Sequence, residues 1–136
     1  MMMKRLFFIL PLLLVLFAAC NKEASYSVKL KNLSAGPVRI TVRLDQAFAA
    51  PGQNTLKLDK TVLQGQSVEI YYNKGVGISL PTVNDSLLKY TVQVLNQDSV
   101  PSNRNFRNLN NYSTNGSNTK KKIYIYEGPI VVGDFL

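Results

Sequence analysis

The chain has 136 residues, with 16 lysine and arginine side chains against 8 acidic ones, a single cysteine and no histidine. This length suits one domain with one hydrophobic core. Because histidine is absent, the chain lacks the commonest general base and the usual zinc ligand, which excludes Ser-His and Cys-His nucleophiles. A single cysteine also excludes an internal disulfide.

The first 19 residues have the organisation of a secretory signal. Lys4 and Arg5 form a positively charged start, and residues 6–19 are an apolar run of 14 residues. A membrane-spanning helix needs about 20 apolar residues, so this run is too short to cross a bilayer. A charged start, a short apolar middle and small residues at the end, here Ala18 and Ala19, predict a signal peptide over residues 1–19.

Cys20 follows these small residues directly, and the stretch Phe17-Ala18-Ala19-Cys20 resembles the lipobox of bacterial lipoproteins. The resemblance implies a diacylglyceryl group on the thiol, cleavage before Cys20 and an acyl chain on the new amine, with no other cofactor. Phe17 departs from the leucine usual in that family. The alternatives are a plain signal peptide followed by a chance cysteine, or a cysteine in the core. Several acyl chains hold a protein durably at a membrane, whereas one holds it only marginally.

The residues after Cys20 bear on the destination of the protein. In lipoproteins of bacteria with two membranes, an aspartate after the cysteine can favour retention in the inner membrane, and this chain has Asn21. Lys22-Glu23 is similar to a short signal on some surface-exposed lipoproteins. The resemblance therefore implies a cell-envelope protein of the outer membrane, with residues 20–25 as a lipidated tether and the periplasmic or surface face left open.

Loss of Lys4 and Arg5 with the signal leaves 14 basic and 8 acidic side chains, a formal net charge of +6. A basic balance suits nucleic acid, anionic lipid or acidic glycan. Beyond the membrane nucleic acid is not an expected partner. The basic residues are also scattered, because Lys29, Lys31, Arg39 and Arg43 alternate with apolar residues as on the solvent face of strands.

Residues 26–136 alternate apolar and polar side chains along most of their length, the period typical of half-buried strands. Tyr26, Val28 and Leu30 share one face of the first run, and the second run repeats the pattern from Val38. We predict that these two runs are adjacent antiparallel strands, and that no helix of ten or more residues follows. The fold class predicted is all-β, a single antiparallel β-sandwich of immunoglobulin-like size with seven or eight short strands. The expected strands lie within residues 26–33, 38–44, 56–62, 67–72, 78–80, 87–95, 121–126 and 129–132.

An asparagine-rich loop over residues 102–119 interrupts this pattern, with seven asparagines and no acidic residue. Loops of this length inside a compact domain are uncommon and are often functional or disordered. Arg104, Phe106, Arg107 and Tyr112 combine aromatic faces and guanidinium groups with amides, a set that suits a glycan or a protein partner. The alternative is that the aromatic side chains fix the loop to the sandwich while the asparagines only turn the chain.

Other chemistry has weaker support. A Ser–Lys dyad or a pair of carboxylates remains arithmetically possible, but no spacing selects one. Asn84, Asp85 and Asp98 could offer oxygen ligands to Ca²⁺, yet the spacing of a calcium loop is absent, so no metal site is expected. Two triplets, 85–87 and 98–100, resemble an Asp-Ser/Thr-apolar O-glycosylation acceptor, with Ser86 and Ser99 as the modified residues.

Three classes of function follow from these observations. The first, and the one we expect, is a lipid-anchored binding or adhesion module whose partners are the membrane and a glycan or envelope protein. The second is a structural or accessory envelope protein without a small ligand. The third, a small hydrolase, has no recognisable catalytic motif, and we do not expect an enzyme.

Overall fold

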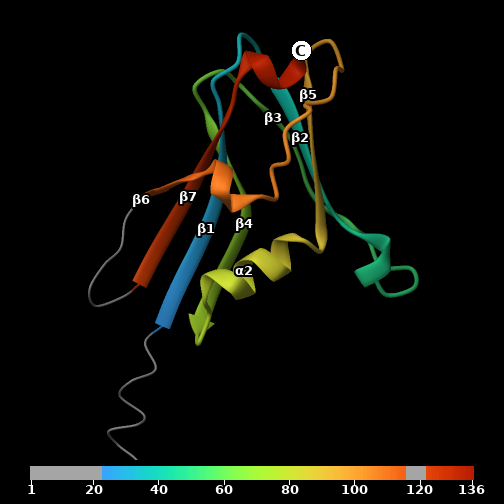
Figure 1. Cartoon of the computed structure of the whole chain (residues 1–136). Coiled ribbons are helices and arrows are strands. Elements are labelled where there is room, and N and C mark those ends of the chain that lie inside the picture. The colour runs from blue at the N-terminus through green and yellow to red at the C-terminus, as the bar shows by residue number, and fades with distance from the viewer. Residues whose placement is uncertain (1–22, 116–121) are drawn as a thin grey trace, which may run out of the picture.

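The computed structural model describes residues 23–115 and 122–136, which form a β-sandwich of two facing sheets (Figure 1). One sheet has four strands in the order β4-β1-β7-β6, and the other has three in the order β3-β2-β5. The prediction of an all-β sandwich is confirmed. The strands are β1 (Glu23–Asn32), β2 (Val38–Leu44), β3 (Leu56–Val62), β4 (Ser67–Val76), β5 (Tyr90–Asn96), β6 (Ser113–Asn115) and β7 (Lys122–Ile130).

β1 begins three residues before the expected start at Tyr26, so residues 23–25 of the expected tether already belong to a strand. Ala24 packs into the core, and Ser25 lies in register between Lys74 of β4 and Ile123 of β7. Both neighbouring strands extend as far as β1 does, and their backbone groups pair with these residues. Cys20 and the signal over residues 1–19 lie outside the described residues, as do residues 116–121.

β1 and β2 do not pair with each other, so the prediction of two adjacent antiparallel strands is wrong. β1 is antiparallel to β4 and parallel to β7, while β2 is antiparallel to both β3 and β5. Both edges of β1 are therefore occupied, and the connection between β1 and β2 carries the chain from one sheet to the other. The alternation in β1 and β2 correctly indicates which face of each strand is buried. It does not indicate which strand lies beside each of them.

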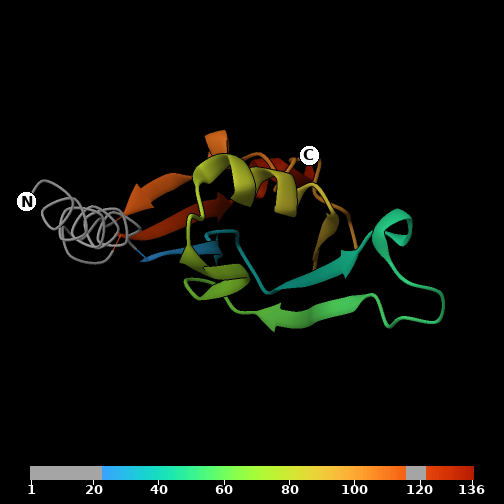
Figure 2. The same ribbon diagram turned by 90° about the horizontal axis from the view of Figure 1, so that it is seen from below.

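Residues 80–87 form a helix, where the sequence had suggested a strand over 78–80. The helix α2 (Leu80–Leu87) has Ser79 at its N-cap and Pro81 in its first turn, where proline is tolerated. Val83 and Leu87, four residues apart, are both buried on one face. At eight residues α2 is consistent with the prediction that no helix of ten or more residues is present. It connects β4 to β5 across one end of the sandwich (Figure 2).

Three short 3₁₀ helices complete the fold: η1 (Gln46–Phe48), η2 (Leu109–Asn111) and η3 (Val132–Phe135). Asp45 caps η1 and Asn108 caps η2, each by accepting a hydrogen bond from a backbone N–H two residues along. η3 directly follows β7 and lies at the end of the sandwich opposite to the start of β1 (Figure 1).

The core lies between the two sheets and consists of the residues that the alternation assigns to the inner faces. Tyr26, Val28 and Leu30 of β1 are buried, as predicted, and so are Val38, Ile40 and Val42 of β2. Tyr26 stacks on Tyr124 of β7, with ring centroids 4.8 Å apart. The buried aliphatic and aromatic side chains provide the main hydrophobic stabilisation of the fold.

Asn32, the last residue of β1, is fully buried, and both donors and both acceptor positions of its carboxamide form hydrogen bonds. Its Nδ2 donates to the backbone oxygens of Gly36, at 2.8 Å, and Val62, at 2.9 Å. Its Oδ1 accepts from the backbone N–H of Ser34, at 2.9 Å, and from the Ser34 hydroxyl, at 2.6 Å. One side chain therefore joins the end of β1, the crossing segment 33–37 and the end of β3, which belongs to the opposite sheet.

Replacing Asn32 by aspartate keeps both acceptors but removes both donors, and it leaves a buried carboxylate facing two carbonyl oxygens. We expect Asn32→Asp to lower the free energy of unfolding by about 2–4 kcal/mol, measured by urea unfolding followed by circular dichroism. The control is Asn54→Asp, since exposed Asn54 only accepts a hydrogen bond from Leu56 N–H and aspartate can do the same. Equal losses for both variants would contradict this role for Asn32.

Candidate functional site

The described part of the asparagine-rich loop, residues 102–115, runs along the outer edge of β5 before it forms η2 and β6. Pro101 forms a bridge to Leu95, and the Ser102 N–H donates to the Val94 carbonyl at 2.8 Å. Asparagine side chains turn this segment, as when Asn105 Oδ1 accepts from the Arg107 N–H at 3.0 Å. The segment thus has defined contacts with the sandwich, and the rest of the expected loop, 116–119, lies outside the described residues.

Phe106 and Tyr112, two of the four residues predicted to bind a ligand, are buried, with exposures of 2% and 9%. The Tyr112 hydroxyl donates to the Phe106 carbonyl at 2.6 Å. Burial raises the pKa of Tyr112 well above its ordinary value, so this hydroxyl stays protonated and keeps donating. Neither residue presents an aromatic face to solvent, and their positions favour the alternative in which the aromatic side chains fix the loop to the sandwich.

Arg104, the third predicted residue, points toward the C-terminal 3₁₀ helix. Its Nε donates to Asp134 Oδ1 at 2.7 Å, and the side chain of Asp134 is only 5% exposed. The other oxygen of Asp134 accepts from the Val131 N–H at 2.9 Å. A buried carboxylate needs such partners, so this guanidinium stabilises η3 instead of facing a ligand.

Arg107, the fourth, lies on the opposite side of the segment and is half-buried. Its Nη1 is 3.3 Å from the Tyr90 carbonyl and 3.4 Å from the Leu88 carbonyl, where the chain enters β5. The structure therefore brings Phe106 and Tyr112 together but separates the two arginines. Arg107 lines a surface hollow.

This hollow, here called the amide hollow, lies between the end of α2 and the asparagine-rich segment and has a volume of about 290 Å³. No acidic side chain lines it, and its polar lining consists of Arg107 with Asn84, Asn105, Asn108 and Asn110. The oxygens of Asn105 and Asn108 accept backbone N–H groups at 3.0 Å. Within residues 23–115 and 122–136, the NH₂ groups of these four asparagines donate no hydrogen bond to the protein. The hollow therefore offers donors to a ligand that is rich in acceptors.

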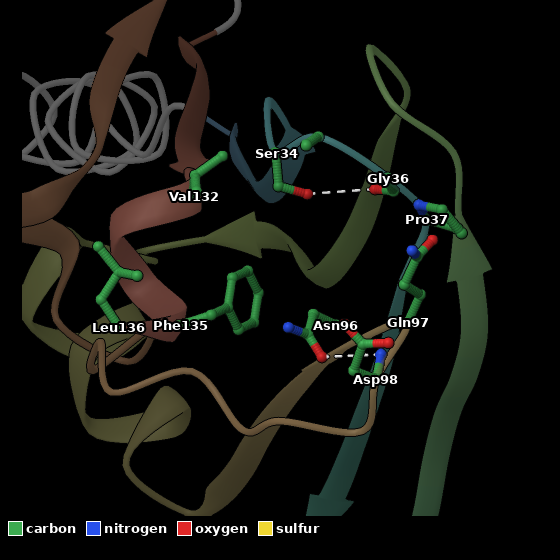
Figure 3. A pocket seen from close by; sticks show the side chains of 10 residues that line it. Ser34, Gly36, Pro37, Asn96, Gln97, Asp98, Val132, Phe135 and Leu136 are labelled. Carbon is green, nitrogen blue, oxygen red and sulfur yellow. Dashed lines mark hydrogen bonds between the residues drawn. The ribbon is translucent and has the colours of Figure 1, made fainter.

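A second hollow, of about 230 Å³, lies at the end of the sandwich where β1 and β5 finish (Figure 3). Phe135 of η3 and Asn96 of β5 line it together with Ser34 of the crossing segment. Within this hollow Asn96 Oδ1 already accepts from the N–H groups of Asp98, at 3.0 Å, and Val100, at 2.9 Å. Sequence reasoning missed this hollow and the contribution of Asn84 to the first one, because both combine segments that are distant in the chain.

The two serines of the predicted O-glycosylation triplets occupy different environments. Ser99 is exposed in the turn after β5 and has a positive φ of 62°. Ser86 is half-buried within the helix α2. Modification at either serine stays a prediction.

The carboxylates of the described residues lie in different surroundings, since Asp85 and Asp98 are exposed whereas Asp134 is buried. Glu69 and Glu127 lie on either side of Lys29 in register, on the open face of the four-stranded sheet. Each accepts a hydrogen bond from a serine hydroxyl, Ser27 for Glu69 and Ser67 for Glu127. Within the described ranges, no group of three or more acidic or cysteine side chains is placed to hold a metal ion.

Comparisons of the chain with protein-family models, with curated proteins and with solved structures find no match. Of the helices in the described part of the chain, none combines the length and the apolar character needed to span a bilayer.

The anchoring of the asparagine-rich segment depends on glycine at position 128 of β7. A Cβ atom built there would lie 2.7 Å from the ring of Tyr112, whereas one at Gly133 would meet nothing within 4 Å. We expect Gly128→Ala to displace Tyr112 and to lower the free energy of unfolding by about 1–3 kcal/mol in chemical denaturation. Gly133→Ala is the matched control and should change it by less than about 0.5 kcal/mol. If both variants unfold like the parent, Tyr112 does not anchor the segment.

Proposed function

We propose that this chain is a lipid-anchored protein of the cell envelope whose β-sandwich is a non-enzymatic binding module. The lipobox-like stretch ending in Cys20 supports the anchor, with the diacylglyceryl and amide-linked acyl chains as the attachment. Asn21 supports the outer membrane. Only residues 21 and 22 separate Cys20 from the first residue of β1, so the module sits close to the bilayer.

The amide hollow is the observation that supports a binding module best. Four asparagines and one arginine line it, and Arg107 is held there by two backbone carbonyls. Carboxamide NH₂ groups and a guanidinium donate to hydroxyl, carbonyl or carboxylate oxygens. Because Phe106 and Tyr112 are buried, the ligand is held without their aromatic faces. An acidic glycan has the acceptor-rich chemistry that fits these groups.

A structural or accessory role is the second candidate, and a specific contact favours it. The asparagine-rich segment covers the edge of β5, where Ser102 N–H and Arg107 bond to backbone carbonyls. Uncovered strand edges pair with other chains and promote aggregation. On this view the segment protects the sandwich and the hollow has no ligand.

The anchor is tested by replacing the one residue that can carry it. We expect Cys20→Ser to abolish incorporation of labelled palmitate and to release the protein from the membrane fraction after a carbonate wash. The parent chain, processed before Cys20, should float with membranes in a density gradient. A variant that still floats, or a mature parent protein with a free thiol and a free amine, contradicts the proposal.

The amide hollow is tested by replacing Asn84 and Asn110, whose side chains make no hydrogen bond within the described residues. We expect Asn84→Ala and Asn110→Ala to weaken retention on an array of acidic glycans at least about tenfold when combined, since each removes hydrogen bonds to the ligand. Thermal unfolding should be unchanged. Gln93→Ala, which removes an exposed carboxamide of β5 outside the hollow, is the control and should bind like the parent. Absence of binding by the parent to any glycan favours the structural role.

A further inference from the structure

Exposed apolar side chains gather on the outer face of the four-stranded sheet at the end where β1 begins. Tyr72 and Val76 of β4 are 54% and 61% exposed, and Ile123 of β7 is 41% exposed. The strand register places all three on one face, because Val76 is paired with Glu23, Tyr72 with Ser27 and Ile123 with Ser25. This position is unusual for apolar residues, since the same face farther along carries Lys29, Glu69 and Glu127.

Basic side chains accompany these apolar ones. Lys74 lies between Tyr72 and Val76 on the same face of β4, and its Nζ is 3.1 Å from Glu23 Oε1. Lys122 begins β7 beside Ile123. Tyr72, Lys74, Lys122 and Ile123 border a shallow hollow of about 210 Å³, together with Glu23. We call Tyr72, Lys74, Val76 and Ile123 the tether-end patch.

The position of the patch relative to the anchor identifies its partner. Glu23, which is paired with Val76, follows Cys20 by three residues, and a chain of that length spans roughly 10 Å when extended. Tyrosine suits the boundary between headgroups and acyl chains, and lysines pair with anionic headgroups while their methylene stems contact apolar groups. The second hollow lies at the other end of β1, roughly 30 Å away at about 3.3 Å per residue.

We propose that the tether-end patch is a membrane-binding surface that lies against the anionic phospholipid headgroups of the bilayer in which Cys20 is anchored. This inference rests on the proposed lipid anchor. Contact at two places, the acyl chains and the patch, fixes the orientation of the sandwich. The end that carries η3 and the crossing segment then faces away from the bilayer.

The chain contains no tryptophan, so one introduced tryptophan reports its own surroundings. The experiment uses the mature lipidated protein in vesicles of brominated phosphatidylcholine and phosphatidylglycerol, compared with vesicles of the same lipids without bromine. We expect the fluorescence of Tyr72→Trp to fall by about half in the brominated vesicles, because bromine quenches tryptophan within the bilayer boundary. Val132→Trp, at a position 53% exposed on the opposite end, should not be quenched.

Two further variants in the Tyr72→Trp background separate the patch from the anchor. Lys74→Gln with Ile123→Ser should abolish the quenching while the protein still floats with the vesicles. Lys60→Gln with Leu63→Ser, an exposed pair on and beside β3, is the matched control and should leave the quenching intact.

Each remaining outcome overturns the inference. Protein that floats but shows equal quenching at positions 72 and 132 means that the patch does not face the bilayer while the anchor stands. A blue shift of the Tyr72→Trp emission without bromine quenching means that a second copy of the chain covers the patch. If the protein does not float with the vesicles, both the proposed lipid anchor and the proposed orientation are wrong.

Discussion

Asn32 connects the two sheets by a hydrogen-bonded side chain at the point where the chain leaves one sheet for the other. All four hydrogen-bonding positions of its carboxamide are occupied, and its backbone also bonds to the β3–β4 turn through Gln66 and Gly65. Hydrophobic packing holds the sheets together but is not directional. The hydrogen bonds of Asn32 add direction, because each requires a defined position of Ser34, Gly36 or Val62. Asn32 thereby contacts segment 33–37 at Ser34 and Gly36, immediately before β2 begins.

The sequence predicted the faces of the strands well and their partners poorly. Alternation along β1 and β2 assigned Val28 and Ile40 correctly to the core, since burial on one face leaves a local pattern. Strand pairing leaves no such pattern, and the parallel contact between β1 and β7 joins segments almost a hundred residues apart. The helix was missed for another reason. With only Val83 and Leu87 on its buried face, α2 is too short to show a helical period, although Ser79 and Pro81 are a typical start.

The asparagine-rich segment illustrates why a candidate site is harder to predict than a fold. Its composition is compatible both with binding a ligand and with fixing the segment to the sandwich. Which of the two occurs depends on residues elsewhere in the chain. Tyr112 is buried because Gly128 leaves room for its ring, and Arg104 is engaged because Asp134 is buried beside it. Neither partner could be identified from the segment itself. Asn84 became part of the amide hollow only through α2, which the sequence analysis had not predicted.

The parallel pairing of β1 with β7 gives the molecule two chemically different ends. Both strands start at the same end, so Ile123 lies beside Ser25 and contributes to the tether-end patch. Both strands also finish together, where the Leu33 N–H donates to the Ile130 carbonyl at 2.8 Å. η3 follows β7 at that end and lines the second hollow with the crossing segment. An antiparallel pairing would have reversed β7 and placed η3 beside the tether. If the protein is anchored as proposed, the direction of β7 therefore determines which of the two ends lies toward the membrane.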